Sequence, residues 1–365
     1  MKTDSQAPAH AQARANKSVI TLALALANQS RIRRLKQRRT RNSLAVFSAA
    51  FMAAACSSDG ARYELRLGHD QTNGHPYDVA VDTFVERVAR ATDGAVRIRV
   101  FPAAQLGDSP EQIEGLRMGT LDLALAAFSH ASQFCKEFGL FGAPFLFESD
   151  AHFAAVFDHE VGSILDEACS QRYTIRLLST LTSGYRVLFN GKRPVESTAD
   201  LRGLKIRVMG GEADALTWQV FGAIPVPMPY SEVYSALQAG VIDGAENEAV
   251  SVLANKFYEA APYFARTNHL VLPMGLFISQ QTLQELPPEY REILREQARQ
   301  AAVWERDLMA ERNAAALAEM QQQFGVQESS LESAELRARS IQIQDQVAGK
   351  LGLQELLQKV REAAK

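Results

Sequence analysis

The sequence predicts a two-lobed α/β protein, and three observations point to this class. The chain has 365 residues, which at about 100–200 residues per domain suggests two domains. From Tyr63 onward, segments with strand patterns alternate with segments of helical periodicity, an order typical of a mostly parallel sheet covered by helices. A continuous helical pattern over 288–324 is long enough, at about 1.5 Å per residue, to span both lobes.

The first block of elements runs from Tyr63 to about Thr180. Alternating or apolar segments predict strands at 63–69, 96–101, 121–127 and 174–180. Helical periodicity predicts helices at 77–91, 110–118 and 151–169. Pro76 is a favoured residue at the start of a helix, and Gly119 is a typical residue just after the end of one.

A second block begins near Gly184. Ser197 and Asp200 have the spacing of a capping box at the start of a short helical turn, which Gly203 ends. Strands are expected at 204–208, 224–226 and 242–246, helices at 213–221 and 231–239, and an extended run at 268–279. The predicted domains are a signal peptide at 1–55, a first lobe at 56–183 plus about 273–312, and a second lobe at 184–272 plus about 313–365.

The first 55 residues are predicted to form an export signal. The basic segment 31–41 precedes an apolar run at 44–55, which is too short to span a membrane. Residues 53–56 read Ala-Ala-Ala-Cys and resemble a bacterial lipoprotein box, so we expect lipidation of Cys56; ordinary cleavage beside an unmodified cysteine is the alternative. The signal is unusually long, and a start codon assigned too far upstream would explain this length.

The net charge of −3 hides an uneven distribution of charge along the chain. Residues 1–55 hold ten of the 39 basic side chains and one of the 42 acidic ones, which leaves 29 basic and 41 acidic side chains in 56–365. A body this acidic is a poor general binder of nucleic acid or anionic lipid. An anion that binds to it must meet a local cationic site.

The other two cysteines, Cys135 and Cys169, leave two alternatives open. An oxidising compartment permits a disulfide between them, and two buried free thiols fit the sequence as well. We favour the free thiols, since the sequence does not give the distance between the two side chains.

The sequence contains none of the motifs that mark common catalytic centres. It lacks the nucleophile elbow, the Walker loop, the HExxH zinc motif and a dinucleotide-binding glycine pattern after a strand. Its seven histidines have no metal-ligand spacing. We therefore expect ligand capture rather than catalysis, with no cofactor and no metal.

Arg207 and Arg186 are the candidate anion-binding residues. In the 204–208 strand, Arg207 alternates with apolar residues near the carboxyl end, where ligands bind in open α/β sheets. A guanidinium presents a planar fork that matches a carboxylate. Arg186 lies at the start of another strand, and the alternative for either residue is a solvated surface arginine.

Several segments resemble the solute-binding subunits of tripartite ATP-independent periplasmic (TRAP) transporters, the DctP-type family. The segments, in family order, are FPAAQLGD (101–108), GLRMGTLDLALA (115–126), APFLF (143–147), STADLRGLKIRV (197–208), GAIPVPMPYSEVYSALQAGVIDGAENEAV (222–250) and ELPPEYREIL (285–294). The resemblance implies a two-lobed fold, a long helix spanning both lobes and a cleft that closes on a carboxylate-bearing acid by hinge motion.

The resemblance also implies roles for individual residues. Arg207 matches the arginine that clamps the carboxylate, and Arg186 matches a second arginine that assists it. Asn247 matches a cleft amide, and Tyr230 matches an aromatic residue that packs on the ligand, with plain core packing as its alternative.

Three further residues fall where the other lobe lines the cleft. They are Asp70, Asp108 and His69, whose alternatives are a turn residue, a helix N-cap and a strand end. The chain departs from the family at Met209-Gly210, where proline is frequent, and near Ala127, where a polar residue is sometimes found. These departures bear on the identity of the ligand.

The resemblance implies a periplasmic receptor, expected to be a monomer, that delivers an organic acid to a TRAP membrane permease. A ligand-sensing module and a periplasmic lyase or isomerase acting on sugar acids are the alternatives. The expected ligand is a sugar acid such as a uronate, or a C4-dicarboxylate. We favour the hydroxylated acid, because Asp70 and Asp108 would accept hydrogen bonds from hydroxyls and repel a second carboxylate.

Overall fold

The computed structural model describes residues 61–331 and 333–364, so Cys56 and the predicted export signal lie outside the described residues. The strands are β1 (Tyr63–Gly68), β2 (Val96–Phe101), β3 (Leu123–Ala127), β4 (Ile175–Tyr185), β5 (Val187–Asn190), β6 (Lys205–Val208), β7 (Ile224–Pro227), β8 (Gly244–Asn247), β9 (Tyr263–Ala265), β10 (Val271–Ser279) and β11 (Gln327–Ser329). The α-helices are α2 (Pro76–Ala91), α3 (Ser109–Met118), α4 (Phe128–Ala131), α5 (Asp150–Phe157), α6 (Glu160–Tyr173), α7 (Glu212–Phe221), α8 (Val233–Gln238), α9 (Ala249–Ala254), α10 (Gln280–Glu285), α11 (Pro288–Gln323), α12 (Ala334–Leu351) and α13 (Gln354–Glu362). Short 3₁₀ turns are η1 (Lys136–Gly142), η2 (Thr198–Leu201), η3 (Tyr230–Glu232) and η4 (Phe257–Glu259).

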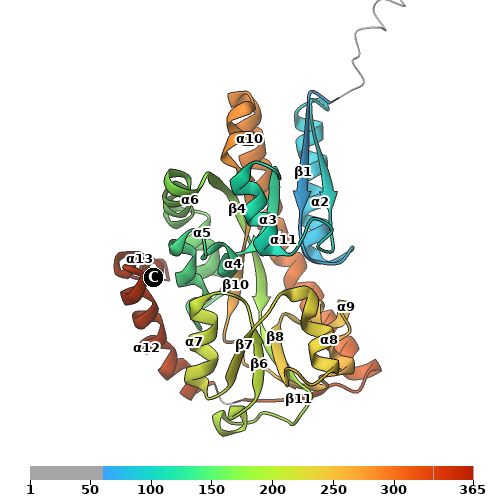
Figure 1. The fold of residues 1–365 in the computed structure, drawn as a ribbon, viewed down its shortest axis with the longest axis vertical. Coiled ribbons are helices and arrows are strands. Elements are labelled where there is room, and N and C mark those ends of the chain that lie inside the picture. The colour runs from blue at the N-terminus through green and yellow to red at the C-terminus, as the bar shows by residue number, and fades with distance from the viewer. Residues whose placement is uncertain (1–60, 332, 365) are drawn as a thin grey trace, which may run out of the picture. The chain divides into compact units, whose positions relative to one another are not determined.

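The first lobe is built on a five-stranded sheet of order β2-β1-β3-β10-β4 (Figure 1). β1 runs parallel to β2 and β3, whereas β10 runs antiparallel to β3 and β4. Side chains of β3 alternate between two apolar cores: Leu123 and Leu125 pack with α2 and α11, and Ala124 and Ala126 pack with α3, α5 and α6. Helices therefore cover both faces of this sheet, as the α/β class requires.

The second lobe is built on a six-stranded sheet of order β11-β9-β5-β8-β6-β7. β6 is parallel to both β7 and β8, and β5 is antiparallel to β8 and β9. One apolar core lies between this sheet and α8 and α9, and another lies on the side of α7 and α12. The predicted α/β class with two lobes is confirmed.

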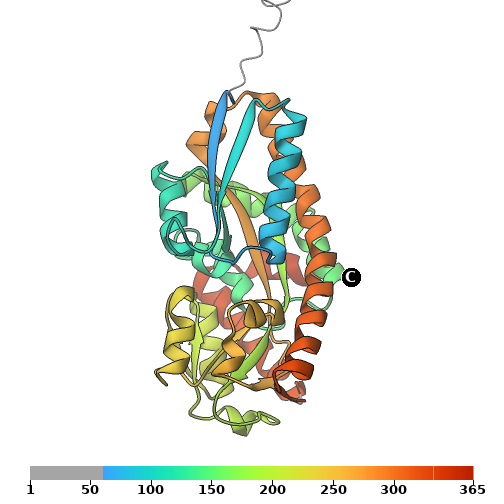
Figure 2. The same cartoon turned by 90° about the vertical axis from the view of Figure 1, so that its right-hand side faces the viewer.

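Within residues 61–331, three segments of the chain cross between the lobes. β4 leads directly into β5, β9 leads into β10, and α11 packs on α2 and β4 of the first lobe and on α9 of the second. Figure 2 shows α11 in orange running along both sheets. Both sheets are mixed rather than mostly parallel, because the crossing strands β10 and β5 run antiparallel to their neighbours.

Several helices differ from the prediction. The expected helix at 151–169 is two helices, α5 and α6, separated by Asp158 and His159. Helices α4, α9, α10, α12 and α13 were not predicted. The apolar side chains of α13, including Leu356 and Val360, pack in the first-lobe core beside Phe153 rather than in the second lobe, to which residues up to 365 were assigned.

Cys135 and Cys169 form a disulfide with a Cα–Cα distance of 5.6 Å. It joins the residue that precedes η1 to α6, and both sulfurs lie in the apolar core. The preference for free thiols was therefore wrong, because the fold brings together two cysteines 34 residues apart. None of the described helices is long and apolar enough to cross a membrane.

Candidate functional site

A small polar cavity lies between the two lobes. The first lobe contributes Asp70, Gln71, Tyr77, Ala127, His130, Leu272 and Met274, and the second contributes Arg186, Arg207, Met209, Tyr230, Asn247 and Glu248. Its volume of about 30 Å³ has room for only about two water molecules. Five of the seven predicted ligand-binding residues line it: Asp70, Arg186, Arg207, Tyr230 and Asn247.

Arg207 is the cation of this cavity whose charge has no carboxylate partner. It lies on β6 and is 3% exposed. Its Nε donates to the carbonyl oxygen of Met228 at 3.1 Å, and its guanidinium carbon lies 5.8 Å from the centre of the Tyr230 ring. Among residues 61–331 and 333–364, Arg207 forms no ion pair and its Nη2 has no hydrogen-bond partner. Burial lowers the pKa of Arg207 from its usual value, so this site favours an arriving anion.

Arg186 also lines the cavity, but its guanidinium is occupied by protein groups. Nη1 donates to Glu248 Oε2 at 2.8 Å, Nη2 donates to the Glu246 backbone oxygen at 2.7 Å, and Nε donates to the Glu246 carboxylate. Burial alone would lower the pKa of Arg186, but the two carboxylates raise it above its usual value. In this arrangement Arg186 holds Glu246 and Glu248 in place, and its charge is compensated within the protein.

Tyr230 and Asn247 form a hydrogen-bonded group beside Arg207. The Tyr230 hydroxyl accepts a bond from Asn255 Nδ2 at 2.9 Å and one from Asn247 Nδ2 at 3.4 Å. The same hydroxyl donates to Gln71 Oε1 of the first lobe at 3.4 Å. Burial raises the pKa of Tyr230, which keeps the hydroxyl protonated and able to donate.

The three predicted residues of the first lobe have different positions. Asp70 lines the cavity and accepts a hydrogen bond from Ser109 Oγ at 2.7 Å, and burial raises its pKa. Asp108 does not line the cavity; its Oδ2 accepts a bond at 2.6 Å from Ser231 Oγ in the second lobe. His69 is also outside the lining, with its Nε2 3.2 Å from Asp78 Oδ1, and burial lowers its pKa to about 4.

Further polar contacts join the two lobes around the cavity. Ser129 Oγ donates to Asp214 Oδ1 at 3.1 Å, and His75 Nε2 lies 3.0 Å from Ser251 Oγ. Burial, reinforced by the charge of Glu246, raises the pKa of Asp214 to about 7. These contacts and the Asp108–Ser231 bond hold the lobes against each other.

Sequence reasoning missed four polar residues that line the cavity: Gln71, Tyr77, His130 and Glu248. Alternation along a strand did not point to Glu248, because Glu248 and the adjacent Asn247 both line the cavity whereas Glu246 does not. The four residues come from segments whose mutual approach depends on the fold.

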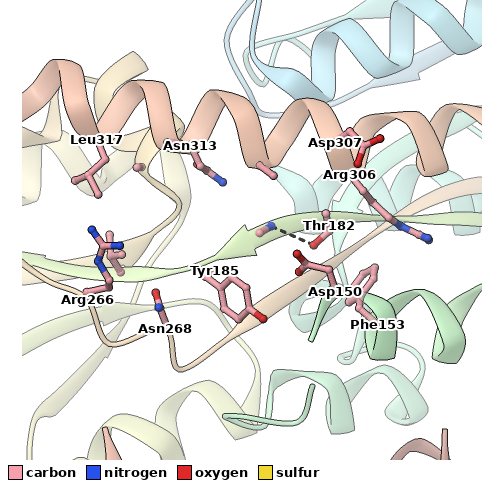
Figure 3. Close-up of a pocket in the computed structure, with 15 residues that line it drawn as sticks. Asp150, Phe153, Thr182, Tyr185, Arg266, Asn268, Arg306, Asp307, Asn313 and Leu317 are labelled. Atoms are coloured by element: carbon pink, nitrogen blue, oxygen red, sulfur yellow. Dashed lines mark hydrogen bonds between the residues drawn. The ribbon is translucent and has the colours of Figure 1, made fainter. Parts of the chain in front are cut away.

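A larger groove of about 310 Å³ lies along α11, on the other side of the crossing segment (Figure 3). Tyr185 faces this groove while Arg186 faces the small cavity, as alternation along extended backbone requires. The cations of the groove are compensated: Arg266 pairs with Glu328 at 2.6 Å, and Arg306 pairs with Asp158 at 2.7 Å. The smaller cavity is therefore the better candidate for binding an anion.

Comparison with known proteins identifies the family of this chain. The profile of the family described as bacterial extracellular solute-binding protein, family 7 (DctP) matches residues 67–350. The 2,3-diketo-L-gulonate-binding periplasmic protein of Escherichia coli is 31% identical over 262 residues, which are 72% of this chain and 80% of that protein. A solute-binding protein of Chromohalobacter salexigens is 36% identical over 237 residues, 65% of this chain and 70% of that protein.

Two solved structures are similar over most of the chain. A TRAP periplasmic solute-binding protein from Chromohalobacter salexigens with bound D-glucuronate has a TM-score of 0.78 at 32% identity, covering 82% of this chain and 99% of that chain. A TRAP periplasmic solute-binding protein from a Bradyrhizobium species in complex with D-galacturonate has a TM-score of 0.79 at 30% identity, with the same coverage. The chain belongs to bacterial extracellular solute-binding protein family 7, the DctP-type receptors of TRAP transporters.

Proposed function

We propose that this protein is an extracytoplasmic receptor that binds a sugar acid with one carboxylate, of the uronate class, in the cavity between its lobes. The observation that carries the proposal is the buried Arg207, whose Nη2 has no partner in the described part of the chain and which lines an interlobe cavity. A carboxylate would supply the missing partner through two parallel hydrogen bonds. Relatives with bound glucuronate and galacturonate support the ligand class.

The charges around the cavity favour a single carboxylate on the ligand. Arg186 is compensated by Glu246 and Glu248, which leaves Arg207 as the cation available to the ligand. A second carboxylate would approach Glu248 or Asp70 and be repelled in a site of low dielectric constant. Asp70, Glu248 and Asn247 are instead suited to hydroxyl groups, and we assign Asn247, Tyr230 and Asp70 to ligand contact beside Arg207.

The proposal extends to how the receptor works. As a monomer, it would bind the acid in the periplasm and deliver it to a TRAP membrane permease without chemical change. Lipidation of Cys56 would anchor the receptor to the membrane, and mass spectrometry of the mature protein would detect the lipid. Recovery of the bound acid unchanged after prolonged incubation would separate this function from that of a lyase or isomerase.

A thermal-shift panel tests the binding function. The panel comprises glucuronate, galacturonate, galactonate, succinate, malate and fumarate, each at a high and equal concentration. A ligand at 100 times its Kd adds about 2.7 kcal/mol of stability, so the cognate sugar acids should raise Tm by about 5 °C or more. A rise with dicarboxylates alone would contradict the proposal.

A further inference from the structure

Two residues that line the cavity, besides Arg207, each carry a buried polar atom with no hydrogen-bond partner within the described residues. These atoms are the hydroxyl of Tyr77 and Nδ1 of His130. Tyr77 is 1% exposed and His130 is 6% exposed, and both line the cavity from the first lobe, opposite Arg207. A buried polar group without a partner is destabilising by itself, so these two atoms mark positions where a ligand would supply the partners.

The elements that carry the two residues hold them in place. Tyr77 lies in the first turn of α2, where its backbone N–H donates to His75 Nδ1 at 3.2 Å and its ring packs 4.7 Å from the His75 ring. The other nitrogen of His75 reaches Ser251 in the second lobe. His130 lies in α4, directly after the buried strand β3. When the lobes are together, these contacts hold Tyr77 in position, and the short helix α4 sets the backbone of His130.

Both groups are neutral under physiological conditions. Burial and the charges of Glu248 and Glu305 raise the pKa of Tyr77 well above its usual value, so the hydroxyl stays protonated. Burial and the two arginines lower the pKa of His130 to about 3, so the imidazole is uncharged. A neutral imidazole and a phenol each offer one donor and one acceptor, which suits hydroxyl groups and supplies no positive charge to compensate a second carboxylate.

We infer that Tyr77 and His130 are the specificity-determining residues of the receptor, which recognise the hydroxyl groups of the acid whose carboxylate binds Arg207. This inference rests on the proposed function. A site with a buried polar group discriminates strongly against a ligand that lacks the matching hydroxyl, because the protein group then stays without a partner. The two residues would decide which sugar acid binds, whereas Arg207 accepts the carboxylate that all these acids share.

The test combines protein variants with ligand analogues in calorimetric titrations. The variants are Tyr77→Phe, which removes one oxygen, and His130→Phe, which removes the ring nitrogens. His130→Asn retains a polar atom near Nδ1, and Tyr290→Phe is a matched control on α11, where Tyr290 packs against Tyr63. The ligands are glucuronate and galacturonate, which are epimers at C4, and their monodeoxy analogues at C2, C3 and C4.

We expect Tyr77→Phe and His130→Phe each to lower the affinity for the tighter-binding of the two uronates about 10-fold. Each variant should keep the wild-type affinity for one deoxy analogue, the one that lacks the hydroxyl which the substituted residue contacts. His130→Asn should recover part of the loss, and Tyr290→Phe should bind as the wild type does. Unchanged affinity for the parent uronate in variants with wild-type Tm would overturn the inference. Equal losses for every analogue would also overturn it, because they indicate a structural role. A wild-type protein that binds none of the uronates would instead contradict the proposed function.

Discussion

Arg207 is the residue on which ligand affinity should depend most. The buried guanidinium of Arg207 has lost its hydrating water, and its Nη2 has no hydrogen-bond partner among the described residues. A carboxylate that pairs with it would compensate this cost of desolvation. Removing one partner of a buried charge pair costs about 2–5 kcal/mol. Arg207→Ala should therefore weaken uronate binding about 30-fold or more, and Arg207→Lys should also bind poorly because it lacks the planar fork.

Calorimetry on folded variants measures this effect. Arg266→Ala is the matched control, because Arg266 is paired with Glu328 in the other groove. Near-unchanged uronate affinity in a folded Arg207→Ala protein would show that Arg207 does not bind the carboxylate.

Arg186 should matter for stability as much as for binding. Its removal would leave the buried carboxylates of Glu246 and Glu248 without their cation, and an uncompensated buried charge destabilises a protein by about 3–5 kcal/mol. Arg186→Ala should lower the free energy of unfolding by that amount in urea denaturation, whereas Arg207→Ala should not. Equal stability of the two variants would show that the ion-pair network contributes little.

The sequence indicated some residues of the cavity and not others. The alternation of the 204–208 strand and the resemblance both pointed to Arg207, and the structure places it at the cavity. The partners of Arg186 could not be predicted from strand patterns, because Glu246 is 60 residues away and the pairing depends on β5 lying beside β8. His130 and Tyr77 carry no local signal, since their importance comes from buried polar atoms that have no hydrogen-bond partner in the part of the chain that the structure describes.

At the scale of elements, Glu305 links the long helix α11 to the crossing strand β4. Its Oε2 accepts a hydrogen bond from the Thr182 backbone N–H at 3.1 Å, and the side chain is fully buried. Burial raises the pKa of Glu305 to about 8, with a nearby negative charge from Glu248. Glu305 is therefore protonated in the folded protein below about pH 8. In the unfolded chain the same side chain loses its proton above about pH 4.5.

The sign of the resulting pH dependence follows from proton binding. Between about pH 4.5 and 8 the folded state binds more protons at this site, so the contribution of Glu305 to stability falls as pH rises and is constant above about pH 8. The change in the free energy of unfolding that Glu305→Gln causes should therefore be more stabilising at pH 9 than at pH 5, by about 1 kcal/mol or more. Urea denaturation at both pH values measures this difference, with the exposed Glu311→Gln as control. The same difference in both variants would contradict the assignment.

The elements themselves were predicted well where the pattern is local. The helix expected at 288–324 is α11 at Pro288–Gln323, because its periodicity and its start at proline are written within the segment. The mixed pairing of the sheets was not predicted, because the direction of β10 depends on the chain crossing back from the second lobe. The split between α5 and α6 was also missed, although Gly162 in the first turn of α6 marks it: a Cβ at this position would collide with the Phe157 carbonyl oxygen at the end of α5.

At the scale of the whole molecule, the cavity volume implies motion. A space of about 30 Å³ is far smaller than the roughly 300 Å³ or more of typical ligand pockets. A sugar acid therefore enters only when the lobes separate, and hinge closure of the lobes is the expected response to binding. Small-angle X-ray scattering should show a smaller radius of gyration with saturating uronate than without it.

The Arg207→Ala variant at the same uronate concentration is the control for this measurement and should keep the larger radius. Identical wild-type profiles with and without ligand, at a concentration where calorimetry shows saturation, would argue against closure. Weakening the interlobe bond by Ser231→Ala should reduce the change in radius without abolishing binding.

The most direct measurement is a calorimetric titration series on the wild-type protein. Glucuronate and galacturonate are compared with succinate, malate and fumarate under the same conditions. Arg207 is the buried cavity cation that has no carboxylate partner among the described residues, and it lies in a lining that also holds Asp70 and Glu248, so we predict one-to-one binding of at least one uronate and no measurable binding of the dicarboxylates. Tight succinate binding with no measurable uronate binding would contradict it.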